Sequence, residues 1–158
     1  MKRLKLLLWL LILLPLAPAA RSNPALSDIA VVVGRDVPVD DISFTDLRKI
    51  VLGDRQFWSS NLRVTLLIRA PMAHERDVLL KNVLQMSEAQ FRQYWIGKVF
   101  RAENAATPKA VYSNEMAVSL VNSIPGSVAF IEASQVPKDL KVVRVGGLRP
   151  GEKGYPLN

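Results

Sequence analysis

Four short runs of apolar, largely β-branched residues constrain the fold of this chain more than any other feature. The clearest is Ile29–Gly34, "IAVVVG", which contains no polar side chain and is typical of a strand covered on both faces. Further strands are predicted over residues 62–69, 128–132 and 141–145. Because segments with a helical pattern separate several of these runs, their order favours an α/β fold with a central sheet.

The helical segments carry recognisable start signals. Ser43 and Ser87 each stand three residues before an Asp or Gln, which is the spacing of a capping box. The helix predicted over residues 87–100 places Phe91, Trp95 and Val99 at positions i, i+4 and i+8, so we expect these side chains on one buried face. Helices are predicted over residues 43–53, 73–84, 87–100 and 114–122.

The first 19 residues have the composition of a secretory signal peptide. Three of the first five residues are basic, an apolar run covers Leu6–Leu16, and an Ala-Pro-Ala pattern ends at Ala19. This apolar run is shorter than the roughly 18–20 residues that a membrane-spanning helix needs. We therefore expect cleavage after Ala19, a periplasmic domain over residues 20–147 without a stable membrane anchor, and a mobile tail over residues 148–158.

The charge of the predicted mature chain gives little support to nucleic-acid binding. Three of the 21 basic residues lie in the leader, which leaves 18 against 14 acidic ones and a net charge of +4. The basic residues are scattered, and export would separate the chain from nucleic acid, so nucleic acid is not an expected partner. The chain contains no cysteine, which excludes disulfides and an acylated tether.

Three segments share their order and spacing with a known family. They are "IAVVVGRDVPVDDISFTDLRKIVLGDRQFW", "LIRAPMAHERDVLLKNVLQMSEAQFRQYW" and "IPGSVAFIEASQVPKDLKVVRVGG". Together they resemble the second lobe of the phosphate-binding proteins of bacterial phosphate ABC transporters, over roughly residues 27–147. The resemblance implies an α/β fold, a single lobe of the type II periplasmic-binding-protein kind, with a central mixed sheet flanked by helices.

The resemblance places a ligand site in the turn that follows the strand at residues 62–69. Arg69 stands where the family has its ligand-binding arginine, and Arg76 stands where a Ser-Gly-Thr-Arg turn has its arginine. An alternative interpretation needs no ligand, because Arg69 and Arg76 can pair with the nearby carboxylates of Glu75 and Asp77.

Three residues of this turn depart from the family pattern. Ala73, His74 and Glu75 replace the serine, glycine and threonine. Ala73 offers no hydroxyl, His74 adds a side chain where an anion would approach, and Glu75 adds a negative charge. Glu75 also suits the first turn of a helix without any ligand. We therefore expect weak binding, at most, of a small oxyanion such as phosphate.

No catalytic or metal-binding constellation is recognisable in the sequence. His74 is the only histidine, so a zinc site of the usual kind is not expected, and we interpret it as a surface or capping residue. We expect no enzymatic activity and no cofactor. Two functions remain open: an exported, solute-binding-like lobe with weak or partner-dependent oxyanion binding, and a periplasmic accessory module that has lost the site and contacts an envelope protein.

Overall fold

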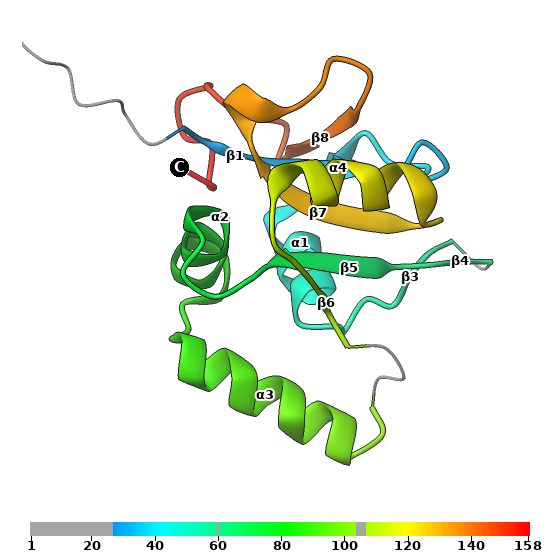
Figure 1. Cartoon of the computed structure of the whole chain (residues 1–158), viewed down its shortest axis with the longest axis vertical. Coiled ribbons are helices and arrows are strands. Elements are labelled where there is room, and N and C mark those ends of the chain that lie inside the picture. The colour runs from blue at the N-terminus through cyan, green and yellow to red at the C-terminus, as the bar shows by residue number, and fades with distance from the viewer. Residues whose placement is uncertain (1–26, 60, 104–106) are drawn as a thin grey trace, which may run out of the picture.

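The computed structural model describes residues 27–59, 61–103 and 107–158. Within these ranges six strands form one mixed sheet in the order β2-β8-β1-β7-β5-β6 (Figure 1). Its strands are β1 (Ile29–Val33), β2 (Asp41–Ile42), β5 (Thr65–Arg69), β6 (Lys109–Val111), β7 (Ser127–Glu132) and β8 (Lys141–Val145). β5 is parallel to β6 and β7, whereas β1 is antiparallel to β7 and β8. The carboxyl ends of β5, β6 and β7 therefore share one edge of the sheet.

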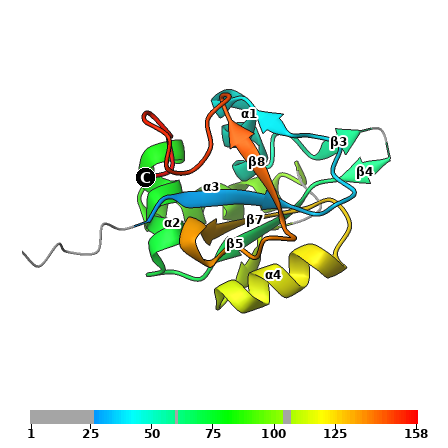
Figure 2. The same cartoon turned by 90° about the horizontal axis from the view of Figure 1, so that it is seen from above.

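Helices cover both faces of this sheet (Figure 2). They are α1 (Phe44–Val51), α2 (His74–Val78), its π-helical continuation η1 (Leu79–Leu84), α3 (Glu88–Phe100), α4 (Asn114–Ser123) and the short 3-10 helix η2 (Ala133–Gln135). Two apolar clusters separate the layers: one joins the sheet to α1, α2, η1 and α3, and the other joins it to α4. The predicted α/β fold with a mixed sheet flanked by helices is confirmed.

The packing of β1 explains why its sequence contains no polar residue. All five of its side chains are buried, and alternate residues face the two apolar clusters: Val31 packs on the α1 side and Val32 on the α4 side. The predicted caps are also present. The Ser43 side chain accepts a hydrogen bond from the backbone of Asp46 at 3.0 Å, and Ser87 begins α3 in a complete capping box.

Two of the predicted boundaries were wrong. Residues 62–69 do not form one strand: β4 (Leu62–Arg63) pairs with β3 (Phe57–Ser59) in a separate small sheet, and β5 begins at Thr65. The chain changes partners here because the Val64 amide donates to Gln56, whereas the Thr65 amide donates to Gly126 beside β7. Residues 101–112, for which the sequence predicts neither a helix nor a strand, contain the edge strand β6 (Lys109–Val111).

The expectation of a mobile tail after residue 147 was also wrong. Tyr155 and Leu157 are fully buried in the core cluster on the α1 side. The Leu157 carbonyl accepts a hydrogen bond from the Ile29 amide at 2.7 Å, and the Tyr155 hydroxyl donates to the Ile29 carbonyl at 2.8 Å. Burial raises the pKa of Tyr155 well above its ordinary value. The end of the chain therefore covers the start of the central strand.

α3 is only partly a core helix. Phe91 and Trp95 are buried as predicted, but Val99 is half exposed. None of the helices within the described residues is long and apolar enough to cross a membrane. The predicted signal peptide, residues 1–19, lies outside the described residues, as does the start of the predicted domain at residue 20.

Candidate functional site

The predicted site lies at the carboxyl edge shared by β5, β6 and β7. Arg69 is the last residue of β5 and pairs in register with Val111 of β6, and α2 begins at His74 after a tight turn. Met72 in this turn has a positive φ of 72° and is 94% exposed. In open α/β sheets, ligands bind outside this edge of the strands, so the turn occupies a suitable place for a site.

Arg69 and Glu75 form a largely buried ion pair in this turn. The Arg69 Nε atom lies 3.3 Å from Oε2 of Glu75, and the two side chains are 15% and 6% exposed. The predicted pairing of these two residues is confirmed. Among the described residues, the Nε and Nη1 atoms of Arg69 are buried without a partner at hydrogen-bond geometry. The carboxylate thus neutralises the guanidinium without satisfying its buried donors.

The exposed carboxylate of Glu115 interacts with the Arg69 charge but forms no ion pair with it. Glu115 is in the first turn of α4, where its own backbone amide, the Ser113 hydroxyl and the Arg69 charge lower its pKa. The carboxylate that pairs with Arg69 is that of Glu75, and an external anion arriving here meets a guanidinium whose charge is already neutralised.

Arg76 is held by Glu88 of α3 and by the backbone carbonyl of Arg69. Its Nε and Nη2 atoms donate to the two carboxylate oxygens of Glu88 at 2.7 and 2.8 Å, and Nη1 donates to the Arg69 carbonyl at 2.9 Å. The hydrogen bonds from Arg76 lower the pKa of Glu88, although burial opposes this effect. The prediction that Arg76 pairs with Asp77 was wrong. The carboxylate that binds the guanidinium is that of Glu88 of α3, in a bidentate geometry.

Ala73 and His74 occupy the entrance of α2. Ala73 is the N-cap and makes no side-chain hydrogen bond, so the helix start lacks the donor or acceptor that a serine would give. His74 does not cap the helix. It is half buried, and its Nε2 atom has no hydrogen-bond partner among the described residues. No group of three His, Asp or Glu side chains suited to a metal ion occurs within the described residues.

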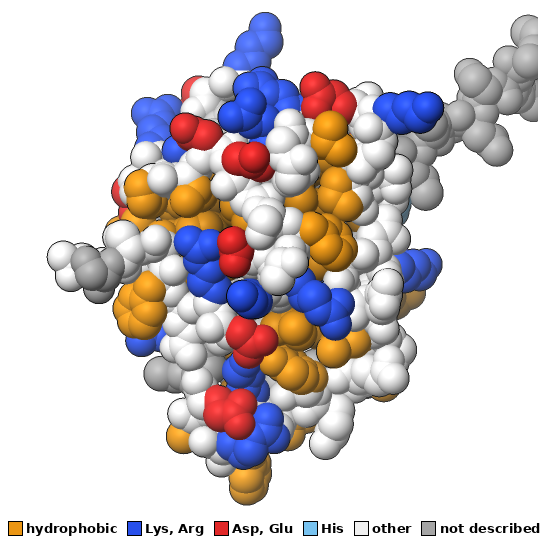
Figure 3. All heavy atoms as spheres, turned by 180° about the vertical axis from the view of Figure 1, so that it is seen from behind, with side chains coloured by type: hydrophobic (Ala, Val, Ile, Leu, Met, Phe, Trp, Pro, Cys, Tyr) orange, Lys and Arg blue, Asp and Glu red, His pale blue; other side chains and the backbone are white. Residues whose placement is uncertain are grey.

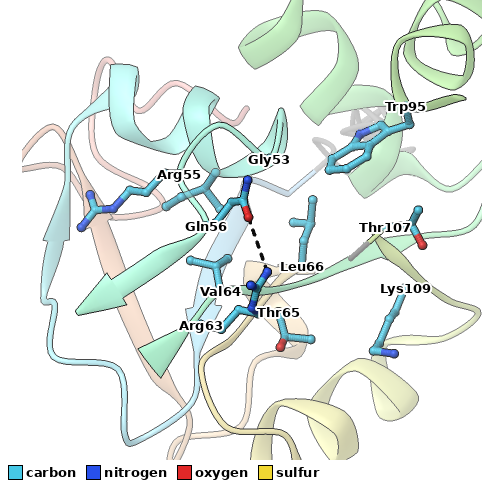
Figure 4. Close-up of a pocket in the computed structure, with 11 residues that line it drawn as sticks. Gly53, Arg55, Gln56, Arg63, Val64, Thr65, Leu66, Trp95, Thr107 and Lys109 are labelled. Atoms are coloured by element: carbon cyan, nitrogen blue, oxygen red, sulfur yellow. Dashed lines mark hydrogen bonds between the residues drawn. The ribbon is translucent and has the colours of Figure 1, made fainter. Parts of the chain in front are cut away.

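A separate cavity of about 300 Å³ lies near the start of β5 rather than at its end (Figure 4). Thr65, Leu66 and Trp95 line it, and Arg63 closes one side by donating to Gln56 at 3.4 Å. Neither a carboxylate nor a histidine lines this cavity, so it offers no acid–base pair for catalysis. No local sequence pattern indicates this cavity, because the lining residues come from segments far apart in the chain.

Solved structures of phosphate-binding proteins have the same fold. PstS from Borrelia burgdorferi matches with a TM-score of 0.65 and 17% identity over 83% of this chain and 54% of its own. An ABC-type phosphate transport receptor from Vibrio cholerae matches with a TM-score of 0.63 and 21% identity over 78% of this chain and 48% of its own. A phosphate-binding protein from Stenotrophomonas maltophilia matches with a TM-score of 0.60 and 14% identity, over 78% and 40%.

The chain has the fold of one lobe of a phosphate-binding protein. It spans about half the length of these structures, and identities at this level show the fold alone. No protein-family model matches the sequence, and no curated protein matches it.

Proposed function

We propose that this protein is an exported, non-catalytic, solute-binding-like lobe whose oxyanion position is closed by its own Glu75. The observation that carries the proposal is the largely buried Arg69–Glu75 ion pair at 3.3 Å. Arg69 has the place at the sheet edge that a ligand-binding arginine would need, and a carboxylate of the same chain neutralises it. Glu75 therefore acts as an internal substitute for the ligand.

The remaining charges at the turn support weak binding. Arg76 is engaged by Glu88, and Arg69 is paired with Glu75. A hydrogen bond to a charged group contributes about 1.5–3 kcal/mol, so two missing hydroxyl donors, at the positions of Ala73 and Glu75, reduce binding by about 3–6 kcal/mol. A micromolar site corresponds to about −8 kcal/mol, which places the expected affinity for phosphate near the millimolar range or weaker.

Titration calorimetry of the mature protein with phosphate, sulfate and molybdate tests this function. We expect no micromolar binding to the unmodified chain. Substituting Ala73→Ser, His74→Gly and Glu75→Thr together is expected to create measurable affinity, and adding Arg69→Ala is expected to abolish it. Micromolar binding of phosphate by the unmodified protein would refute the proposal.

An accessory role in the periplasm is the second candidate. Exposed apolar side chains flank the closed site: Met72 is 94% exposed, and Tyr112, which follows the β6 partner of Arg69, is 74% exposed. Such residues beside a neutralised charge suit contact with an envelope protein better than contact with a small anion. If the triple substitution produced no anion binding, this second function would be favoured.

Neither candidate involves nucleic acid. On the face shown in Figure 3, basic side chains alternate with acidic ones and do not form one positive patch. Binding to a phosphate backbone depends on clustered lysines and arginines, so this distribution supports the exclusion of nucleic acid as a partner.

A further inference from the structure

An apolar groove lies between α3 and the edge strand β6. Its volume is about 500 Å³, and it includes Arg76 and Glu88 at one end but neither Arg69 nor Glu75. Its apolar walls are formed by Phe91, Ile96, Val99 and Phe100 of α3 and by Pro108 and Ala110 on the β6 side. The groove is therefore a feature apart from the closed anion site.

The α3 wall exposes more apolar surface than a solvated helix needs. Ile96 is 50% exposed, Val99 is 46% exposed and Phe100 is 90% exposed. These three side chains belong to less than two turns of one helix, and all of them line the same groove. Contiguous exposed apolar side chains that line a concavity mark binding surfaces, whereas single exposed apolar residues do not.

The opposite wall is a strand with an unpaired outer edge. Among the described residues β6 is the last strand of the sheet and pairs only with β5. The Val111 carbonyl accepts a hydrogen bond from the Ala70 amide at 2.9 Å, so the backbone N–H and C=O of Val111 are directed toward β5. Because successive residues of a strand direct their backbone groups to opposite sides, the N–H and C=O of Ala110 are directed away from β5. Such an edge is a template for another strand.

The charges around the groove favour an acidic occupant. Arg92 lines the groove, whereas Lys109 precedes Ala110 on β6 and has its side chain on the opposite face of the sheet; among the described residues neither forms an ion pair. Glu88 is the one carboxylate in the lining, and Arg76 already holds it in a bidentate ion pair. A second copy of this chain would bring the same two cations to the same place, which disfavours a symmetric dimer.

We propose that the groove binds an extended, acidic segment of another protein. The backbone of this segment adds to β6 as a strand through the outward groups of Ala110. Its apolar side chains fill the space against Ile96 and Val99, and its carboxylates, which alternate with them, lie on the other face of the sheet beside Lys109. Main-chain hydrogen bonds give such strand addition its affinity, and the side-chain pocket gives it specificity.

Synthetic peptides titrated into the ¹⁵N-labelled protein test the proposal by NMR. The probe is a short peptide of alternating valine and aspartate. We expect it to shift the amide signals of Ala110, Ile96 and Val99. The same peptide with lysine in place of aspartate is expected to bind at least about tenfold more weakly, a difference of about 1.4 kcal/mol. A version with alternate backbone amides N-methylated is expected not to bind, because it cannot pair with a strand edge.

Variants of the protein separate the groove from other surfaces. Ile96→Asp and Ala110→Pro are each expected to weaken the aspartate peptide at least tenfold; proline is tolerated on an edge strand where its amide would face outward. Phe44→Asp is the matched control, because Phe44 is exposed, lies outside the groove and begins α1, where an aspartate is favourable. This control is expected to bind the peptide like the unmodified protein.

Several outcomes would overturn the proposal. The first is the absence of shifts at Ala110 and on α3 at millimolar peptide, and the second is equal binding of the aspartate and lysine peptides. Sedimentation that finds a dimer dissociated by Ile96→Asp would assign the groove to a second copy of the chain. Binding to vesicles with anionic lipids that Phe100→Asp abolishes would assign it to a membrane surface.

Discussion

Replacing Glu75 by glutamine removes the carboxylate that faces Arg69 and keeps the size of the side chain. Breaking a fully buried ion pair by removing one partner costs about 3–5 kcal/mol. The Arg69 side chain remains 15% exposed, so water can solvate part of its charge and the loss is expected to be smaller. We expect Glu75→Gln to lower the free energy of unfolding by about 2 kcal/mol.

Phosphate should restore most of this loss in the variant. If the Arg69 guanidinium, no longer paired with a carboxylate, binds phosphate with a Kd of about 1 mM, then about 20 mM phosphate adds roughly 1.8 kcal/mol of stability. The unmodified protein should gain almost nothing, because its own Glu75 fills the position. We therefore expect the Glu75→Gln protein to be less stable than the unmodified protein in chloride, and to have nearly the same free energy of unfolding in phosphate.

Urea unfolding followed by tryptophan fluorescence measures both effects, since Trp58 and Trp95 are buried in the folded state. Chloride at equal ionic strength controls for general salt effects. Glu103→Gln is the matched control, because Glu103 pairs with Arg101 at the surface, where an exposed ion pair contributes little to stability. A Glu75→Gln protein with unchanged stability and no response to phosphate would refute the assignment of Glu75 as an internal ligand.

Three further results are expected. Leu157→Ala should lower the free energy of unfolding by about 2–4 kcal/mol in denaturant titrations, whereas a mobile tail would give no change. Glu88→Gln should destabilise the protein near neutral pH. Because Arg76 lowers the folded-state pKa of Glu88, the stability that this carboxylate adds is present above its unfolded pKa and is lost as the pH falls through the lowered value. A difference from the unmodified protein that persists at about pH 2 would contradict this. Intact-mass measurement of the exported protein should give an N-terminus at Ala20 or Arg21, and a mass that includes residues 1–19 would contradict the predicted cleavage.

The local signals of the sequence were sufficient for the main elements. The run Ile29–Val33 indicates a strand buried on both faces, because a strand with apolar side chains at every position would expose half of them if one face met water. Ser87 marks the start of α3 because its hydroxyl accepts from a backbone amide only three residues away. The Arg69–Glu75 pair could also be predicted, since the two residues lie close together in the chain across one turn.

Contacts between distant segments were decided only by the tertiary structure. The sequence by itself determined that a buried strand forms at Ile29–Val33 and that capped helices begin after Ser43 and Ser87, because these depend on neighbours a few residues apart. It did not determine that Glu88, rather than Asp77, holds Arg76, or that Leu157 lies against Ile29. Nor did it mark β6 as a strand, because this short segment is strand-like only through its pairing with β5. Such pairings arise when hydrophobic burial brings remote segments together, and no local pattern records which segments will meet.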